Sequence, residues 1–368
     1  MSPTDLRGFG RNALATLSQW SRGYVRPGAR GLLLGRPPTA EPPADRPRGP
    51  DWVQAAEEWI DEALVHALAK PGGGWYVLDR REVFAGDGPW RFMVAGQALV
   101  IWRAATGLAA APESCPHIGA PLTAGRVEEG RLVCPWHGLK LDERGFRDWR
   151  CHPIHDDGVL VWVRLPGEAP TEAPILAPRP AFGVAATFSE KLRCDPEDVI
   201  ANRLDPWHGA HFHPHSFSAL EVHEKSIERL VLRVVYRVTA RLGIEVDATF
   251  HCPDPRTIVM TIIDGEGVGS VVETHATPIA PGATMLVESS IAGSDRPGFA
   301  YLRHVPAIGR ALQPLIAMRA RKLWVDDAAY AERRYTVRMA AAVSPSAAPA
   351  VPKLVPDPRD APRATHGG

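Results

Sequence analysis

Two short cysteine–histidine pairs constrain this chain more than any other feature of its sequence. In "CPHIGAPLTAGRVEEGRLVCPWHG", residues 115–138, Cys115 and His117 form one pair, Cys134 and His137 form the other, and sixteen residues separate them. Four such ligands can hold one zinc ion or an iron–sulfur cluster, but zinc sites usually group like ligands as C-x2-C and H-x3-H. Mixed pairs on two loops instead suit a two-iron cluster in which thiolates hold one iron and imidazoles the other.

The residues around the pairs support a cluster and carry a family resemblance. Gly119, Gly125, Pro135 and Gly138 predict tight turns that let backbone N–H groups approach the sulfides. The spacing C-x-H-x16-C-x2-H, with "CPH" and "CPWHG", resembles the Rieske [2Fe-2S] domain over about residues 74–165. The resemblance implies that both cysteines and both histidines of the pairs ligate the cluster.

Departures from one branch of that family indicate a low-potential cluster. Rieske proteins of respiratory complexes carry an extra cysteine in each loop and a serine that donates to a sulfide. This chain has Ala120 and Trp136 at the cysteine positions, and Leu139 after Gly138. Fewer donors predict a potential at the low end of the Rieske range, roughly −150 mV. Such a cluster passes its electron onward, which predicts a second redox centre.

A second group of potential metal ligands follows in "NRLDPWHGAHFHPHSF", residues 202–217. Iron in non-haem oxygenases is held by two histidines and a carboxylate, with positions left open. His208 and His213 are five residues apart, roughly 140° around an ideal helix, so a helix must end or bulge for both to reach one metal. From the residues alone, a zinc site or no site stays open, and Asp205 before Pro206 also suits a helix N-cap.

The order of these residues resembles the mononuclear-iron motif of the Rieske non-haem iron oxygenases. The residues at the N-x2-D-x2-H-x4-H positions are Asn202, Asp205, His208 and His213. The resemblance implies that His208 and His213 bind Fe(II). It also implies that Asp205 carries the electron from a cluster histidine of a neighbouring subunit to an iron-bound histidine. His211 and His215 are expected in outer positions and remain alternative ligands.

The third iron ligand is expected near the C-terminus, in "RKLWVDDAAYAERR". In the family the ligand aspartate commonly precedes a glutamate by five residues, and Asp327 with Glu332 fits that spacing. Asp327 is therefore the predicted ligand and Asp326 its alternative. An aspartate that only balances the surrounding arginines and lysine is the competing interpretation.

Patterning along the chain predicts an α+β fold. Short β-like runs between residues 74 and 142 indicate an antiparallel β Rieske domain, and a second β-rich series from 227 to 293 indicates another antiparallel sheet. An Ala-, Arg- and Leu-rich stretch over 307–342 predicts one or two long helices. With the resemblance, the second region is expected to be a helix-grip (START-like) domain.

The expected domain organisation has four parts. Residues 1–50, with a short helix over 13–24, are expected to be disordered or a docking extension, because Pro and Arg dominate their end. Residues 51–167 are the Rieske domain with a leading helix whose N-cap is Asp51, and 168–343 are the catalytic domain. The tail, 344–368, is expected to be disordered.

Composition restricts partners and compartment. Lys+Arg and Asp+Glu are both 42, so no net charge attracts nucleic acid. No apolar run approaches the roughly 20 residues of a membrane span, and the N-terminus lacks a secretory signal, so cytoplasmic residence with optional peripheral membrane contact is expected. Beyond the two paired cysteines, the other three read as ordinary thiols: Cys151, Cys194 and Cys252.

The resemblance implies the terminal component of an oxygenase that uses dioxygen and Fe(II) to hydroxylate, demethylate or desaturate a substrate, with cis-dihydroxylation as an alternative. The chain has no G-x-G-x-x-G site, so a ferredoxin or flavin reductase is the expected electron donor. A homotrimer is implied by resemblance. Strands rich in Val, Ile, Leu and Met, with few inward-facing charges, predict an apolar substrate, for instance terpenoid, carotenoid or steroid-like. The alternatives are an electron-transfer or lipid-binding protein, or a structural subunit, without an active mononuclear iron.

Overall fold

The computed structural model describes residues 25–28, 31–39, 54–294 and 306–343. The helix expected over 13–24 and the tail 344–368 lie outside these residues. The leading helix, α2 (Glu57–Leu68), begins after Ala56, so the expectation that Asp51 is its N-cap is wrong. Glu57 and Glu58 lie in its first turn, where carboxylates are favoured by the helix dipole.

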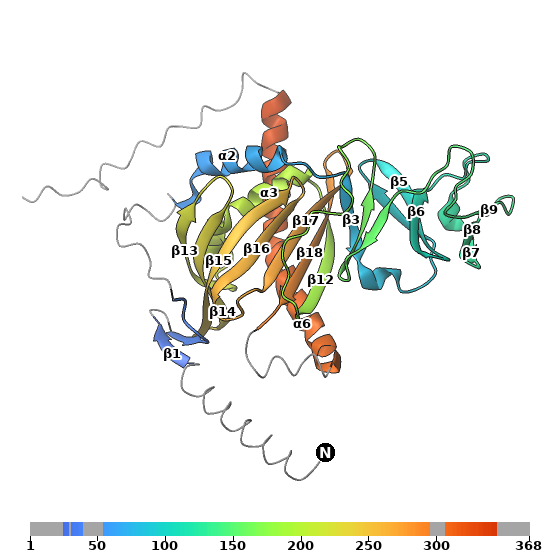
Figure 1. Cartoon of the computed structure of the whole chain (residues 1–368). Coiled ribbons are helices and arrows are strands. Elements are labelled where there is room, and N and C mark those ends of the chain that lie inside the picture. Colours follow the sequence, from blue (N-terminus) through green and yellow to red (C-terminus); the bar gives the residue numbers. More distant parts are fainter. Residues whose placement is uncertain (1–24, 29–30, 40–53, 295–305, 344–368) are drawn as a thin grey trace, which may run out of the picture.

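The region that carries the cysteine–histidine pairs consists of three small antiparallel sheets (Figure 1). Their strand orders are β10-β11-β3, β4-β5-β6 and β7-β8-β9. The elements are β3 (Trp75–Arg80), η2 (Arg81–Phe84), β4 (Trp90–Val94), β5 (Gln97–Ala104), β6 (Gly107–Pro112), η3 (Leu122–Ala124), β7 (Arg126–Glu128), β8 (Arg131–Val133), β9 (Lys140–Leu141), β10 (Ile154–Asp156) and β11 (Leu160–Arg164).

Burial of β5 holds this region together. Four consecutive residues of that strand, Leu99 to Trp102, are fully buried. They face two different clusters, since Leu99 and Ile101 pack with Phe84 and Val163, whereas Trp102 packs toward the loops between β6 and β9. A continuous apolar run is typical of a strand covered on both faces. The loops that carry the two ligand pairs thus rest on a rigid base.

The second region is a nine-stranded sheet with helices. Its path is β1-β2-β15-β16-β17-β18-β12, and β14 pairs with β15 and β13. The strands are β1 (Val25–Gly28), β2 (Gly31–Leu34), β12 (Val184–Leu192), β13 (Phe217–Lys225), β14 (Leu230–Thr239), β15 (Leu242–Asp254), β16 (Thr257–Gly265), β17 (Val271–Ala280) and β18 (Ala283–Ala292). The helices are α3 (Pro196–Leu204), η4 (Pro206–His208), α4 (Gly209–Phe212) and α6 (Pro306–Val343).

Part of the N-terminal extension belongs to this sheet. β2 pairs in parallel with Leu242–Ile244 of β15, at the end of β15 that β16 leaves unpaired. Leu33 is buried there, and Arg26 forms an ion pair with Glu245. Of the two alternatives expected for residues 1–50, disorder does not describe 25–28 and 31–34, which form strands on the sheet, where Leu33 gives this Pro- and Arg-rich stretch an apolar contact.

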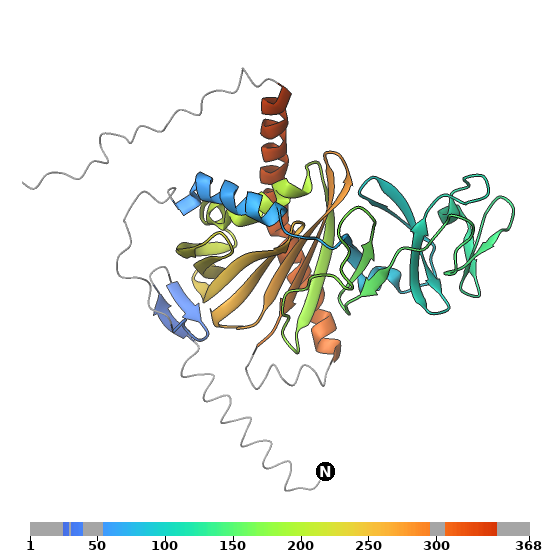
Figure 2. The same cartoon turned by 45° about the horizontal axis from the view of Figure 1, so that its top comes forward.

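The long helix α6 crosses the sheet (Figures 1 and 2). Trp324 and Ala331 of α6 are buried against Phe188, Leu192 and Leu286 of the sheet. α6 continues unbroken over the whole predicted range and past Pro314. A largely antiparallel sheet packed against a long C-terminal helix is the predicted α+β arrangement, which is confirmed. In the part of the chain that the structure describes, no helix combines the length and low polarity that crossing a bilayer needs.

A buried ion network joins the two regions. Arg179, in the irregular segment between them, places Nε 2.6 Å from Glu273 Oε1 on β17 and Nη1 2.9 Å from Asp157 Oδ1 before β11. Both carboxylates are almost fully buried, at 2% and 3% side-chain exposure. Asp157 also accepts the indole N–H of Trp162 at 2.8 Å. Because an unpaired buried charge is costly, this segment is part of the packed structure rather than a loose linker.

This network predicts acid sensitivity. Burial raises the pKa of Asp157, but hydrogen bonds from Arg179 and backbone N–H groups bring it below its ordinary value. Burial likewise raises the pKa of Glu273, and hydrogen bonds from His275 and Arg179 lower it. A depressed carboxyl pKa contributes stability that is present above the unfolded pKa of about 4 and is lost as pH falls below it. We expect the thermal midpoint to drop between about pH 5 and pH 3, measured by calorimetry at constant ionic strength; a flat midpoint over that range would contradict it.

Candidate metal centres

The two cysteine-containing loops have the same backbone shape. The first loop, Cys115 to Gly119, lies between β6 and β7, and the second, Cys134 to Gly138, lies between β8 and β9. In each, the glycine N–H donates to the cysteine carbonyl, at 2.8 and 3.0 Å. Both glycines have positive φ, 83° and 71°, a conformation that side chains with a Cβ rarely adopt. The predicted turns around the pairs are therefore present in both loops.

Each loop buries its cysteine and exposes its histidine. Cys115 and Cys134 are 3% and 2% exposed, whereas His117 and His137 lie at the surface. The two imidazole rings face each other edge-on, with centroids 4.9 Å apart and planes at 73°. Two thiols inside and two imidazoles outside form the ligand set of a Rieske cluster, with the imidazole side toward solvent.

Backbone N–H groups point at the cysteine sulfurs. Burial raises the pKa of Cys134, but N–H donors from Trp136 and His137 outweigh it and lower the pKa below its ordinary value. At Cys115 burial dominates and the pKa is raised, although N–H groups of its own loop oppose the effect. Donors of this kind stabilise thiolates and cluster sulfides, so the cradle fits a [2Fe-2S] cluster.

At the second group, α3 ends before the histidines begin. Leu204 is the last residue of α3, Asp205 is its C-cap, and Pro206 starts the short η4 turn, because a proline cannot supply the N–H that α3 would need. His208 ends η4, and His213 follows the one-turn helix α4. The helix end that the five-residue spacing required is therefore observed. Asp205 also occupies the N-cap of η4, without a side-chain capping bond.

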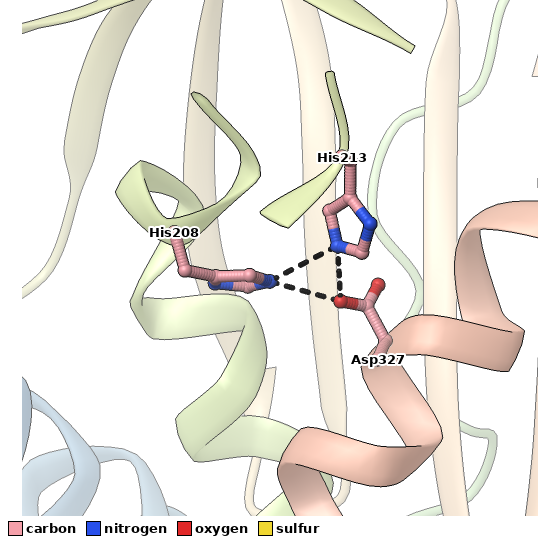
Figure 3. Close-up of side chains that lie close together, drawn as sticks. All are labelled: His208, His213 and Asp327. Carbon is pink, nitrogen blue, oxygen red and sulfur yellow. Dashed lines mark hydrogen bonds and ion pairs between the residues drawn. The ribbon is translucent and has the colours of Figure 1, made fainter. Parts of the chain in front are cut away.

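Three of the predicted ligands converge on one point (Figure 3). Nε2 of His208 lies 2.9 Å from Asp327 Oδ1, Nε2 of His213 lies 2.8 Å from the same oxygen, and the two nitrogens are 3.3 Å apart. Ligands about 2.1 Å from one metal and at right angles to each other lie about 3.0 Å apart. The arrangement therefore fits a two-histidine, one-carboxylate face for a metal ion with further positions open.

A second carboxylate lies behind each of the two histidines. Nδ1 of His208 donates to the backbone carbonyl of Asp205 and lies 3.8 Å from its Oδ2. Nδ1 of His213 lies 3.3 Å from Oδ2 of Asp326. Partners on Nδ1 hold an imidazole in the tautomer that leaves Nε2 free for a metal. The structure thus places Asp326 on the outer nitrogen of His213, and Asp327 between the two inner ones.

The remaining alternatives lie outside the group of three. His211 is exposed and packs edge-on against Trp207, with ring centroids 5.9 Å apart. His215 can share a different, more exposed group with His213 and Asp326, but that group uses the outer side of His213. Glu332, used to choose Asp327, pairs instead with Arg193 at 3.1 Å. That spacing indicated the aspartate that faces both histidine Nε2 atoms, although the glutamate itself pairs outside the site.

Asp327 is buried and ionised. Burial alone raises its pKa, but hydrogen bonds from His208 and His213 and the charge of Arg203 hold it well below the usual range. Nη1 of Arg203 lies 3.8 Å from its second oxygen, and Nδ2 of Asn202 donates to Oδ1 at 3.3 Å. A carboxylate that keeps its charge in a buried site is suited to binding a cation.

Several residues around this site were not predicted from the sequence. Arg203 pairs with the buried Glu288 of β18 and lies over the ring of Trp324, 4.6 Å from its centroid. Tyr330 stacks on His208, with centroids 5.0 Å apart, and its hydroxyl donates to Asp205 Oδ2 at 3.4 Å. Tyr330 follows Asp327 by one helical turn, so the spacing could have identified it. Glu288 has no such spacing from the predicted ligands in the sequence, and it lies at the site only because β18 packs there.

The three converging residues line a cavity of about 460 Å³ between the sheet, α3, α4 and α6. Much of its wall is apolar, including Leu232, Val234, Phe250, Ile258 and Met260. The strands contribute two charged side chains to the cavity, Arg237 and Glu288, and the helices α3 and α6 contribute the others, which are Arg203, Arg319, Lys322 and Asp327. A pocket of this size with a few convergent polar groups suits a small organic ligand.

Comparisons with known proteins support the Rieske assignment. Residues 74–153 match the family model of the Rieske [2Fe-2S] domain, and residues 165–342 match a model described as a domain of unknown function (DUF5914). The chain thus carries a Rieske [2Fe-2S] domain, followed by a sheet-rich domain that contains the three converging residues.

The relatives identify the wider group. The chain is 31% identical over 158 residues to the vanillate O-demethylase oxygenase subunit of a Pseudomonas species, covering 38% of this chain and 47% of that protein. It is 36% identical over 103 residues to the 4beta-methylsterol monooxygenase of Methylococcus capsulatus, covering 28% and 27%. The chain spans about half the length of the first curated relatives it matches. It is homologous to the Rieske non-haem iron oxygenases.

Solved structures support the fold. Dicamba monooxygenase bound to 3,6-dichlorosalicylic acid aligns with a TM-score of 0.55 at 18% identity, covering 74% of this chain and 90% of that one. At this identity the likeness is one of fold: a Rieske domain followed by a sheet-rich domain with a C-terminal helix.

Proposed function

We propose that this protein is the terminal component of an oxygenase, which uses electrons from a Rieske cluster to activate dioxygen at a mononuclear Fe(II). The observation that carries the proposal is the convergence of His208, His213 and Asp327 on the wall of a cavity. Fe(II) in such a site supplies dioxygen activation at its open positions. The reaction is hydroxylation, demethylation or desaturation of a small, largely apolar molecule.

Each residue of the second site has a defined task under this proposal. Asp327 supplies the negative ligand, and Arg203 and Asn202 hold its orientation. Asp205 and Asp326 orient the two histidine rings from behind. The apolar cavity wall keeps water away from the reacting atoms.

Electron entry is proposed to occur between chains. The imidazoles of the cluster lie at the surface, in the β7–β9 region at one end of the molecule, while α2 and β13 mark the other end (Figure 1). A head-to-tail homotrimer would bring the cluster of one chain to Asp205 of the next. Asp205, in contact with His208, is our candidate for the residue that carries the electron between the two centres. A ferredoxin or flavin reductase is the proposed donor, and the cytoplasm the proposed compartment.

The substrate class rests on the cavity. Its Leu, Val, Ile, Phe and Met side chains support a mainly apolar molecule such as a terpenoid, carotenoid or steroid. Two relatives are named for contrasting substrates, since one is a vanillate O-demethylase and another a 4beta-methylsterol monooxygenase. The alternative is an electron-transfer or lipid-binding protein without an active mononuclear iron. It requires an incomplete set of iron ligands, whereas two histidines and one aspartate converge here.

The iron-to-sulfide ratio of anaerobically purified protein tests the proposal. About three irons per two acid-labile sulfides is the expected result, since a two-iron cluster and a mononuclear site add to that value. A ratio that stays near two irons per two sulfides after reconstitution with Fe(II) would support the electron-transfer alternative instead.

A further inference from the structure

The cavity beside the three converging residues carries more positive than negative charge. Four cationic side chains line it: Arg203, Arg237, Arg319 and Lys322. Two anionic side chains line it: Glu288 and Asp327. A pocket for a neutral hydrocarbon gains nothing from a buried cation, because its charge has to be desolvated.

One of the four cations is neutralised by the protein itself. Arg203 forms an ion pair with Glu288, which also accepts hydrogen bonds from Trp324 and from Thr274, the latter at 3.1 Å. The other end of Arg203 faces Asp327 at 3.8 Å. Arg203 and the two anionic side chains of the cavity therefore form one connected group.

Arg237, near the end of β14, differs in having no such partner. Its Nε is buried, and its guanidinium makes no hydrogen bond or ion pair with any described residue. Arginine is charged at all relevant pH values and offers five N–H donors, so a half-buried guanidinium without an acceptor is unusual. Its backbone N–H donates to Ser216 at 2.8 Å, which holds this end of β14 beside the segment that follows the histidine ligands.

Two further cations lie near the same segment. Lys322 of α6 lines the cavity together with His215 and Ser216. Arg319 lies on the same face of α6, three residues earlier, and also lines the cavity. Both side chains are exposed, so they lie where the cavity meets solvent. Neither forms an ion pair with a described residue.

We propose that the substrate is amphipathic, with an apolar body and one anionic group, a carboxylate or an acid of similar charge, that Arg237 binds. Lys322 and Arg319 attract this group at the cavity entrance. The inference deepens the proposed oxygenase function, on which it rests, and it replaces a neutral terpenoid or carotenoid hydrocarbon with an acid. A planar guanidinium matches a carboxylate with two parallel N–H donors, which also orients the apolar body toward the converging histidines.

The test compares acids with neutral amides of the same shape in the protein with both metal centres loaded. The probes are 2-naphthoate with 2-naphthamide and decanoate with decanamide, titrated anaerobically by calorimetry. We expect each acid to bind at least about tenfold more tightly than its amide, since charge-assisted bonds are the stronger kind. Arg237→Gln should remove most of that preference and leave the affinity for the amides unchanged. Arg237→Lys should retain part of the preference for the acid, because lysine keeps the positive charge but lacks the two parallel N–H donors of the guanidinium.

A matched control lies on the same helix. Arg321 is exposed, pairs with Glu190 at 2.9 Å and does not line the cavity, so Arg321→Gln should leave the acid preference intact. Lys322→Gln should reduce it by a smaller factor, about threefold, because water screens an exposed charge. Acids that bind no better than their amides would overturn the inference. So would an Arg237→Gln variant that weakens both members of each pair equally, since that marks a packing role. The iron-to-sulfide ratio of the same samples tests the oxygenase proposal separately.

Discussion

Asp327→Asn is expected to empty the mononuclear site while the Rieske cluster stays in place. Asparagine keeps the shape of the side chain but removes the charge, and the carboxylate oxygen is the atom that both histidine Nε2 atoms face. Loss of a charged ligand should weaken iron binding at least about 100-fold, since even indirect partners of ligands contribute 10- to 100-fold. The ratio of iron to acid-labile sulfide in the purified protein should fall to about two irons per two sulfides. The absorption spectrum of the Rieske cluster should be unchanged, and oxygenation of the substrate should be lost.

Asp326→Asn is the matched control, because the neighbouring aspartate is half-exposed and contacts only the outer nitrogen of His213. Its effect on iron affinity should be smaller, about tenfold, and restored by excess Fe(II). Loss of iron from Asp326→Asn with retention in Asp327→Asn would show that the ligand assignment is reversed.

Arg179→Met is expected to cause a large loss of stability. The substitution keeps the apolar stem and leaves Asp157 and Glu273 buried without their cation. Removing one partner of a buried pair typically costs about 3–5 kcal/mol. We expect the thermal midpoint to fall by several degrees at pH 7, and the fall to shrink near pH 4, where carboxylates protonate and the unpaired charges disappear.

Two further variants separate electrostatics from packing. Glu273→Gln added to Arg179→Met should recover part of the lost stability, because it removes one of the unpaired charges. Arg193→Met, which breaks the exposed pair with Glu332, should leave the midpoint unchanged. If the double variant is less stable than Arg179→Met alone, the network contributes through shape rather than charge.

The Rieske centre was predictable because its ligands and the turn residues that position them are close together in the sequence. Both ligand pairs lie in loops whose turns depend on nearby glycines, so residues 115–138 define the cradle by themselves. The pairing of His208 with His213 was also predictable from nearby residues, since Pro206 ends α3 before the two histidines. The α+β arrangement also followed from local patterning of strands and one long helix.

Other features depended on residues far apart in the chain. Asp327 reaches the histidines only because α6 packs on the sheet through Trp324 and Ala331, and the two aspartates in a row offered sequence analysis no physical reason to choose between them. The N-terminal strands were missed because their stability comes from β15, about 200 residues away, and not from their own composition.

The sequence by itself therefore determined the Rieske domain and the types of metal ligand expected in the second domain, because both are encoded in short spacings and turn residues. Only the tertiary structure decided which aspartate faces the metal site, how the two regions are joined through Arg179, and which cavity cations stay unpaired. Charge pairing in a buried site depends on packing between distant elements, and a linear pattern does not record which side chains meet there.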